Sequence, residues 1–251
     1  MVRCLMGVDS FSWKILIEAL EKATPIYEEG SRVASLGTIQ KFREKAVNLV
    51  AEKVAKVDVL FDGGIGPGEM TKTILKRVRS KVVIGLDPST KMLKKAYEEL
   101  KNLKANLYLV RGVFEYPPLK PETVNLAVFS FSLRDALNLE KTLPQVERLL
   151  KSNGLMLVLE VGKPKNRFLR FIYRLYWFIV APSIVGLKLK LKIGCKNPWR
   201  YIYQTYLRLP SNPQLKQMIS KNFRILTFKE YFLGFVVTVL ACKFSRGSNG
   251  G

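Results

Sequence analysis

Along the middle of the chain, short apolar runs rich in β-branched residues alternate with longer segments whose apolar positions recur at helical spacing. The short runs predict strands at residues 57–62, 82–87, 107–111, 124–130 and 155–161. The longer patterns predict helices near residues 70–79, 90–103 and 139–152, the last of them ended by Asn153-Gly154. Repeated strand–helix–strand units favour the α/β class, with a mainly parallel sheet and helices on both of its faces.

The pattern towards the two ends of the chain completes this architecture. Residues 11–55 predict helices ahead of the first strand, and apolar runs at 223–228 and 235–244 predict a final hairpin that brings the sheet to seven strands. Residues 163–222 predict a basic, apolar helical insertion before that hairpin. We therefore expect one domain over residues 1–244, followed by a flexible Gly/Ser-rich tail at 245–251.

The amino-acid composition excludes several kinds of chemistry. The 251 residues include no histidine, which rules out Ser-His-Asp and Cys-His nucleophile systems, HExxH peptidases and Cys2His2 zinc sites. The cysteines, Cys4, Cys195 and Cys242, have no CxxC spacing, which argues against a disulfide framework and suits a reducing cytosol. We expect no metal site, and proton transfer must use a carboxylate, Tyr, Cys, Lys, Arg or water.

Positive charge is concentrated in one part of the chain. The sequence has 42 Lys and Arg against 20 Asp and Glu, a formal net charge of +22. Residues 161–229 hold 15 of the basic residues and no acidic residue. A stretch of a single sign attracts phosphate, either in nucleic acid or on an anionic membrane.

An aromatic, apolar block lies within this basic stretch. From Leu175 to Leu187 only 13 residues run without a charge, and Pro182 and Gly186 interrupt them, whereas a spanning helix needs about 20 apolar residues. We therefore expect no transmembrane helix here. The basic flanks favour a helix that lies in a bilayer interface or covers the site of a lipophilic ligand. The alternative is an ordinary core helix that packs against the sheet. The N-terminus is too short and too soon polar for a signal peptide, so we do not expect export.

A glycine-rich loop follows the first predicted strand. Asp62 ends that strand, and Gly64, Gly66 and Gly68 would let the backbone pass close to a ligand at the carboxyl end of a strand. A GxGxxG motif from Gly64 would need glycine where Glu69 stands, and the GK[ST] of a phosphate-binding loop is absent. The remaining interpretation is the DxGxGxG loop of S-adenosylmethionine-dependent methyltransferases.

The second predicted strand supplies a matching acid. It ends in Asp87, 19 residues beyond Gly68 and followed by Pro88 and Ser89. A carboxylate at this place can accept hydrogen bonds from both hydroxyls of a ribose. Dehydrogenases place an acid similarly, and an acid that only precedes a helix N-terminus is the structural alternative.

Four further motifs, together with the glycine loop, resemble class I methyltransferases of the UbiE-type family, which C-methylates ubiquinone and menaquinone precursors. The motifs are Tyr27 with Ser31, Arg32, Ser35-Leu36-Gly37 and Phe42-Arg43; Ser130-Phe131-Ser132-Leu133-Arg134-Asp135, which resembles SFGLRN; Leu159-Glu160-Val161-Gly162-Lys163-Pro164, which resembles LEFSKP; and Tyr201 to Thr205 with Leu209-Pro210, which resembles YLxxS and FP. The resemblance runs from about residue 26 to residue 244 and implies a Rossmann-like fold.

The resemblance also implies a site. The residues expected to contact S-adenosylmethionine are Asp62, Gly64, Gly66, Gly68, Thr71, Asp87, Pro88, Val113, Phe114 and Ser130. Tyr201 and Arg32 are expected to bind the acceptor. The chain departs from the family pattern at Val113, where the family has a polar residue, at Asn125, at Gly30-Ser31 and at Gly162. These departures mark a divergent member.

The implied acceptor is a lipophilic, membrane-resident isoprenoid quinone precursor, reached from the cytoplasmic face by an enzyme held peripherally on an anionic membrane. The methyl donor carries its own activation, so the enzyme must align a ring carbon and make it electron-rich. Arg134 is the expected catalytic cation because it can stabilise a phenolate. Water, Glu160 and Tyr27 are the candidates for taking the phenolic proton.

Two other classes of function stay open at this stage. An RNA methyltransferase is favoured by the charge and by the aromatic run at residues 196–206, although the fourth strand lacks the NPPY-type ending of enzymes that methylate amino groups of nucleic acid. A non-catalytic lipid-binding module with the same fold is allowed by the departures at Val113 and Asn125.

Overall fold

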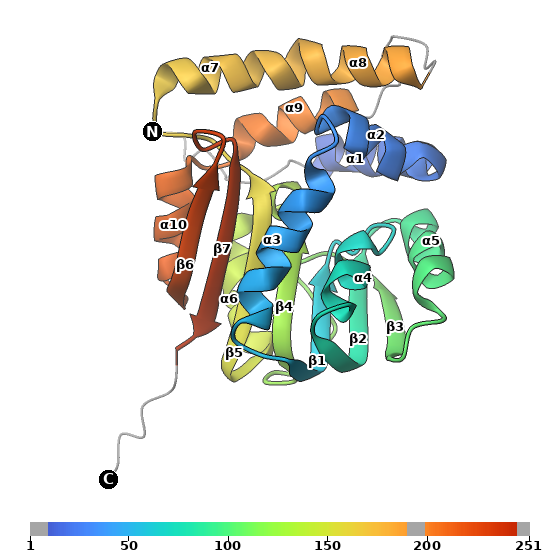
Figure 1. The fold of residues 1–251 in the computed structure, drawn as a ribbon, viewed down its shortest axis with the longest axis vertical. Coiled ribbons are helices and arrows are strands. Elements are labelled where there is room, and N and C mark those ends of the chain that lie inside the picture. The colour runs from blue at the N-terminus through green and yellow to red at the C-terminus, as the bar shows by residue number, and fades with distance from the viewer. Residues whose placement is uncertain (1–9, 190–198, 245–251) are drawn as a thin grey trace.

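A seven-stranded sheet forms the centre of the molecule, in the order β3-β2-β1-β4-β5-β7-β6 (Figure 1). The computed structural model describes residues 10–189 and 199–244, so the expected tail at 245–251 lies outside the described residues. The strands span Lys56–Gly63 (β1), Arg79–Asp87 (β2), Asn106–Arg111 (β3), Val124–Ser130 (β4), Leu150–Val161 (β5), Phe223–Tyr231 (β6) and Val236–Lys243 (β7). Strands β1 to β5 pair in parallel, and β7 is antiparallel to both β5 and β6. The predicted seven-stranded sheet with a final hairpin is thus confirmed.

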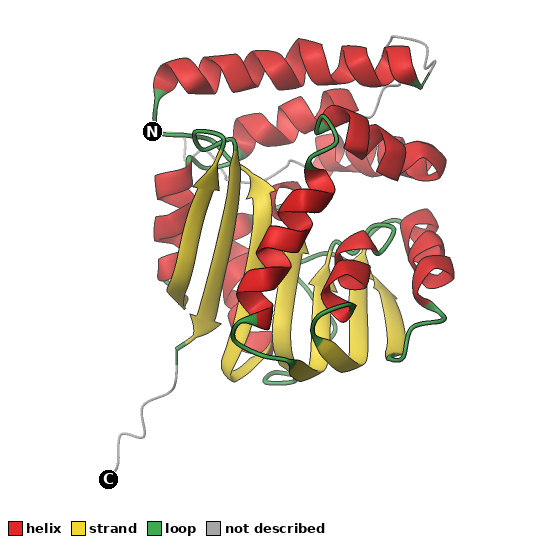
Figure 2. Ribbon diagram, in the orientation of Figure 1, coloured by secondary structure: helices red, strands yellow, loops and turns green. Residues whose placement is uncertain are grey.

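Helices cover both faces of this sheet (Figure 2). One face carries α3 (Ile39–Ala51) and α4 (Glu69–Leu75), whose buried residues join a core with β1 and β4. The other face carries α6 (Leu139–Leu149) and α10 (Asn212–Ser220). Helix α5 (Thr90–Leu100) packs beside β3. In α6 the apolar residues Leu139, Leu143 and Val146 are buried, as their helical spacing predicts.

The junction between α6 and β5 differs from the prediction. The helix ends at Leu149, and Asn153-Gly154 lies inside β5 rather than at a helix end. Asn153 has φ 59°, and the pairing of β4 with β5 shifts from Val124–Leu150 to Leu126–Leu155 across it. Asparagine tolerates this left-handed conformation, so the pair that resembled a helix stop forms an irregularity in a strand.

A helical layer lies beyond the carboxyl ends of the parallel strands, at the top of Figure 1. Its members are α1 (Ser10–Ala23), the 3-10 turn η1 (Thr24–Ile26), α2 (Tyr27–Ala34), α7 (Arg167–Leu175), the π-helical turn η3 (Tyr176–Val180), α8 (Ala181–Lys188) and α9 (Trp199–Arg208). The insertion and the N-terminal helices share one apolar core, which includes Ala34, Trp177, Trp199 and Tyr206. Open α/β sheets bind ligands at this edge, so the layer encloses the region of interest.

Pro182 lies inside a continuous helix of the insertion, although the apolar count treats it as an interruption and predicts no helix long enough to span a membrane. The helix runs from Arg167 to Lys188, 22 residues, and its most apolar 18-residue stretch has a mean hydropathy of 1.4. By length and composition alone this is enough to cross a membrane. The π-turn η3 ends at Val180, two residues before Pro182. A wider turn moves the carbonyl of the preceding turn away from the proline ring, so the helix can continue although proline has no N–H to donate to it. Only 22% of the most apolar stretch is buried in the molecule.

Candidate functional site

A cavity of about 290 Å³ lies between the sheet edge and the helical layer. A smaller cavity of about 70 Å³ adjoins it along the glycine loop. Residues that line both are Leu20, Tyr27, Gly64, Gly66, Ser130, Phe131 and Asp135. The two cavities therefore meet at the carboxyl ends of β1 and β4, where the sequence placed the glycine loop and the Ser130 motif.

The backbone of the glycine loop is held by β2. The Gly64 N–H donates to the Leu86 carbonyl at 2.7 Å, and the Gly66 N–H donates to Asp87 Oδ2 at 2.9 Å. Gly66 has φ +52°, and a Cβ built on it would meet no atom within 4 Å. The loop thus keeps open space beside a backbone conformation that favours glycine.

Asp87 sits at the end of β2 and lines the smaller cavity with Pro88, Val113 and Phe114. Its Oδ1 accepts a hydrogen bond from the Ser89 N–H at 2.8 Å. Each carboxylate oxygen therefore has one backbone donor and a further lone pair. Burial raises the pKa of Asp87 to about 7, although both backbone hydrogen bonds lower it.

Two buried oxygens beside the loop have no hydrogen-bond partner among the described residues, Asp62 Oδ1 and Ser130 Oγ. The other oxygen of Asp62 accepts a hydrogen bond from Thr71 Oγ1 at 2.6 Å. Burial raises the pKa of Asp62 to about 6. A buried polar atom without a partner costs free energy. Ser130 lines both cavities, so its Oγ marks a place where a bound molecule would gain a hydrogen bond, whereas Asp62 lines neither cavity.

A buried ionic cluster stands at the junction of the two cavities. Arg134 Nη1 donates to Glu160 Oε1 at 2.8 Å and also to the Phe131 carbonyl, and Arg134 Nε lies 3.7 Å from Asp135 Oδ1. Burial opposes the charge of Arg134, but Asp135 and Glu160 outweigh it and hold the pKa of the guanidinium above its usual value. Burial likewise raises the pKa of Asp135 to about 6, against the opposing effect of Arg134. The cluster offers a permanent cation beside a carboxylate that ionises near neutral pH.

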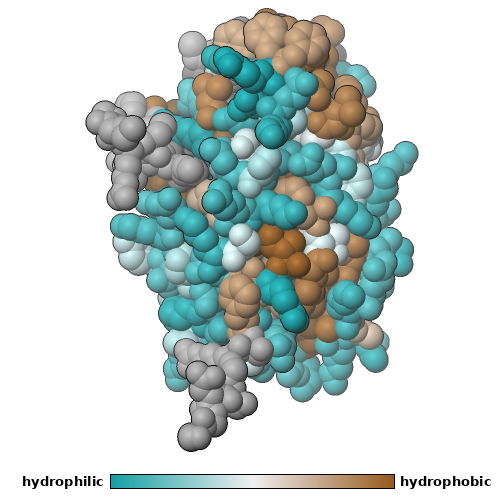
Figure 3. Space-filling model, turned by 90° about the vertical axis from the view of Figure 1, so that its left-hand side faces the viewer, coloured by the Kyte–Doolittle hydropathy of each residue, from teal (hydrophilic) through white to brown (hydrophobic). Residues whose placement is uncertain are grey.

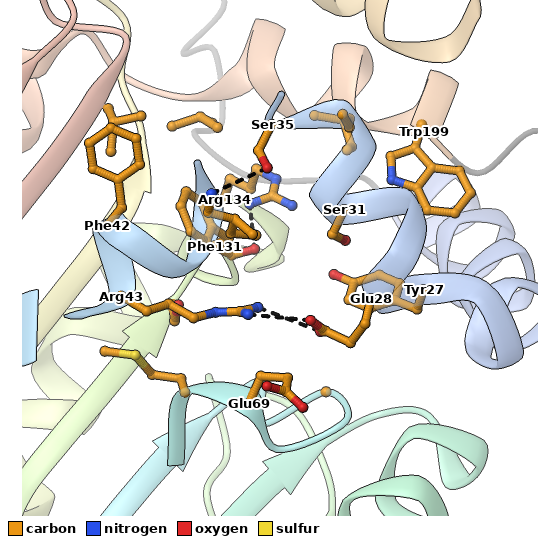
Figure 4. A pocket seen from close by; sticks show the side chains of 18 of the residues that line it. Tyr27, Glu28, Ser31, Ser35, Phe42, Arg43, Glu69, Phe131, Arg134 and Trp199 are labelled. Carbon is orange, nitrogen blue, oxygen red and sulfur yellow. Dashed lines mark hydrogen bonds and ion pairs between the residues drawn. The ribbon is translucent and has the colours of Figure 1, made fainter. Parts of the chain in front are cut away.

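A second polar group lies across the larger cavity. Figure 4 shows Glu28 from α2 and Arg43 from α3 pointing toward each other, with Glu69 below them. Arg43 donates to both Glu28 oxygens, at 3.3 and 3.5 Å. Burial raises the pKa of Glu28 despite this ion pair. The pair ties α2 to α3 and closes the polar end of the cavity.

The remaining wall of the larger cavity is aromatic and apolar. The aromatic residues that line it include Phe42, Phe131, Tyr176, Trp177, Trp199, Phe232 and Phe235. Trp177 stacks on Phe235, with ring centroids 5.5 Å apart. Trp199 packs against Gly30, where a Cβ would lie 1.9 Å from its ring. The cavity thus has a charged end, and the rest of its wall is apolar and aromatic.

The sequence profile of ubiE/COQ5 methyltransferases matches residues 14–243, nearly the whole chain. The chain belongs to the ubiE/COQ5 methyltransferase family. It is therefore an S-adenosylmethionine-dependent methyltransferase, as the resemblance of its motifs predicted.

Curated relatives and solved structures agree with this membership. The ubiquinone/menaquinone biosynthesis C-methyltransferase UbiE of Syntrophotalea carbinolica is 28% identical over 228 residues, 90% of this chain and 93% of that protein. The demethylmenaquinone methyltransferase of Lactobacillus johnsonii is 27% identical over 204 residues, 80% of this chain and 81% of that protein. A crystal structure of an S-adenosylmethionine-dependent methyltransferase from Aquifex aeolicus has a TM-score of 0.57 at 15% identity, covering 85% of this chain and 98% of that one. The class I methyltransferase fold is confirmed.

The structure brings most of the predicted site residues of this UbiE-family chain together. Asp87, Pro88, Val113, Phe114, Gly64, Gly66, Ser130, Tyr27 and Arg134 line one cavity or both. Thr71 lines neither cavity; it is fully buried behind Asp62. Glu160 also lies behind the wall, under Arg134. Gly68 immediately precedes α4 and lies against Leu100 of α5, and it lines neither cavity.

The two residues predicted to bind the acceptor are not both placed there. Arg32 is exposed on α2 and lines neither cavity; it lines an open depression that adjoins the larger cavity at Glu28, Ile39, Arg43 and Glu69. Tyr201 is the third residue of α9, but its side chain lies outside the described residues. Ser31 and Ser35, one helical turn apart, line the cavity instead of Arg32.

Several cavity residues were missed in the sequence analysis. Trp13, Ile17 and Leu20 of α1 lie over the glycine loop, although α1 precedes the matched motifs. Their spacing of three and four residues is that of one helix face, which is the pattern that could have identified them. The ion pair of Glu28 could not be predicted from local spacing, because its partner Arg43 is 15 residues away on another helix.

Proposed function

We propose that this enzyme transfers a methyl group from S-adenosylmethionine to a ring carbon of a lipophilic quinol, an isoprenoid quinone precursor drawn from a membrane. The observation that carries this proposal is the pairing of the Arg134 cation with the Asp135 carboxylate where the two cavities meet, beneath an aromatic, apolar wall. The names of the relatives, which concern ubiquinone and menaquinone biosynthesis, support the same acceptor class.

The residues around the smaller cavity fit the cofactor. The free lone pairs of Asp87 would accept hydrogen bonds from the ribose hydroxyls, and Val113 and Phe114 would pack against the adenine. The open space at Gly66 and the unpartnered Ser130 Oγ would take the methionine end. When bound there, S-adenosylmethionine supplies an activated methyl at the junction of the two cavities.

In the larger cavity, Arg134 would stabilise the phenolate of the acceptor. Its guanidinium is fixed by Glu160 and the Phe131 carbonyl, so little reorganisation is needed when charge develops on the acceptor oxygen. Negative charge on that oxygen raises the electron density of the adjacent ring carbon. That carbon would be the nucleophile toward the methyl that S-adenosylmethionine supplies, with S-adenosylhomocysteine as the leaving group, and the ring proton would then leave to solvent.

The proton of the acceptor hydroxyl would pass to Asp135. Of the residues predicted for this step, Glu160 is fully buried, with both oxygens already accepting hydrogen bonds, and burial raises the pKa of Tyr27 to about 12. Tyr27 therefore stays protonated and suits donation to the acceptor. Asp135 lines both cavities and has a pKa near neutrality, which matches the requirement for a general base.

Labelled S-adenosylmethionine, reduced short-chain benzoquinols and naphthoquinols, and transfer RNA would test the proposal in parallel reactions with the purified enzyme. We expect label on a quinol ring carbon, located by mass-spectrometric fragmentation, and no label in the Asp87→Ala variant. Label on RNA, or on a quinol oxygen, would overturn the proposal.

A further inference from the structure

The helix formed by α7, η3 and α8 buries one side and exposes an apolar side. Trp177, Ala181 and Val185 are buried in the core shared with α2 and α9. The exposed large apolar residues of the helix include Phe168, Phe171, Leu175, Phe178, Ile179 and Leu187. From Phe168 to Phe178 they recur every three or four residues, and Ile179 lies four residues after Leu175, so these residues form one face. We call these six residues the apolar face, and none of them lines a cavity.

Such a surface is unusual for a soluble enzyme. Phe168 is 69% exposed and Leu187 is 77% exposed. Figure 3 shows hydrophobic surface at the top of the molecule, over α7, next to hydrophilic surface. Contiguous exposed apolar residues on this scale mark an interaction site.

The charge around the apolar face selects one kind of partner. Arg167, Arg170 and Arg174 lie along α7, and Lys188 ends α8. Residues 161–229, which contain this helix, hold no acidic residue. An amphipathic helix with aromatic residues on one side and basic residues at its edges suits the boundary between the headgroups and acyl chains of an anionic bilayer.

The mouth of the larger cavity lies beside the same surface. Leu36, in the turn between α2 and α3, and Phe232, in the turn between β6 and β7, are 69% and 60% exposed, yet both line the cavity. The helix joins these turns: Tyr176 Oη donates to the Ala34 carbonyl at 2.6 Å, and Tyr173 Oη donates to the Phe232 carbonyl. A molecule that left a bilayer along the apolar face would therefore meet the opening between Leu36 and Phe232.

We propose that the α7–η3–α8 helix lies in the plane of an anionic lipid bilayer, with the apolar face among the acyl chains, and that the cavity receives its acceptor there, between Leu36 and Phe232. This inference rests on the proposed lipophilic acceptor and adds the surface that delivers it. A spanning orientation is disfavoured because it would break both tyrosine hydrogen bonds and the stack of Trp177 on Phe235.

Flotation of the full chain with vesicles tests the docking surface without requiring any methyl transfer. We expect binding to vesicles of phosphatidylglycerol mixed with phosphatidylcholine, little binding to phosphatidylcholine alone, and release of the bound protein by alkaline carbonate. The double variant Phe168→Ser with Phe171→Ser should bind the anionic vesicles roughly tenfold more weakly. A matched control is Tyr97→Ser with Tyr108→Ser, which removes exposed aromatic residues from α5 and β3 and should bind normally.

Methylation assays separate the failure of this inference from the failure of the proposed function. The Phe168→Ser, Phe171→Ser variant should methylate a soluble short-chain quinol at the normal rate and a long-tailed quinol in anionic vesicles roughly tenfold more slowly. Equal binding of variant and control, equal binding to neutral vesicles, or retention in the membrane after carbonate treatment would overturn the inference. A quinol that is methylated in solution would in that case leave the proposed function standing.

Discussion

The carboxylate of Glu160 lies 2.8 Å from the guanidinium of Arg134, and no part of the Glu160 side chain is exposed. Glu160 Oε2 also accepts a hydrogen bond from the backbone N–H of Arg134, and Oε1 accepts one from the backbone N–H of Val161. Glu160 thus accepts three hydrogen bonds and orients Arg134. Removing one partner of a buried ion pair typically costs about 3–5 kcal/mol because the other charge is left uncompensated.

Arg134→Ala should lower kcat by about 100-fold, as expected for loss of a preorganised group that stabilises developing negative charge. S-adenosylmethionine binding, followed by calorimetry, should change little. Glu160→Gln keeps the size of the side chain and should lower kcat less, by about tenfold, with a lower midpoint of urea unfolding. Normal turnover of Arg134→Ala in a C-methylation assay would contradict the assignment.

The role of Asp135 predicts a specific pH profile. Only its ionised form can accept a proton, and its pKa is raised to about 6 by burial, which Arg134 opposes. With saturating S-adenosylmethionine, the kcat/KM of the wild-type enzyme should be level above pH 6 and fall by about tenfold per pH unit below it. Asp135→Asn should be slow and insensitive to pH over this range, whereas Asp135→Glu should keep an acid limb. An acid limb that persists in Asp135→Asn would assign the proton to another group.

Asp87 should make cofactor binding depend on pH. Burial raises its pKa to about 7, so the unliganded protein carries a proton on this side chain in part at neutral pH. Ribose hydroxyls donate to the ionised form, so binding should release a proton. Affinity should weaken as the pH falls below 7, by up to about tenfold per unit. Calorimetry in two buffers of different ionisation enthalpy measures the released proton.

Two variants check this assignment of Asp87. Asp87→Asn should bind S-adenosylmethionine weakly at every pH, and Asp87→Ala should show no heat of binding. Unchanged binding by Asp87→Ala would remove the residue from the cofactor site.

The site residues that were predictable from the sequence are those that lie at the carboxyl ends of the strands. Gly66 and Asp87 follow apolar runs that could only be buried strands, and parallel strands bring their carboxyl ends to one edge. Arg32 illustrates what a linear motif misses. Tyr27, Ser31 and Ser35 follow one another at intervals of four residues and face the cavity, whereas Arg32 is turned by one residue, about 100°, and faces solvent.

Long-range contacts account for the other differences. The hydroxyl of Thr71 donates a hydrogen bond to Asp62, and the packing of α4 on β1 brings these two side chains together. The helix through Pro182 continues because η3 widens the turn before it, whereas the sequence pattern favoured a break at the proline. Packing of the insertion against α2 therefore outweighed a local signal.

The contact between Gly30 and Trp199 gives a test of how the insertion shapes the acceptor cavity. A Cβ at Gly30 would lie 1.9 Å from the Trp199 ring, and Trp199 lines the cavity. Gly30→Ala must therefore displace that ring, and we expect a loss of about 1–3 kcal/mol in the free energy of unfolding and a higher KM for the acceptor. Trp199→Leu removes the ring, so adding Gly30→Ala to it should cost far less than it does in the wild type. Urea unfolding of the four proteins measures the coupling between the two sites. Additive losses would show that Trp199 does not restrict position 30.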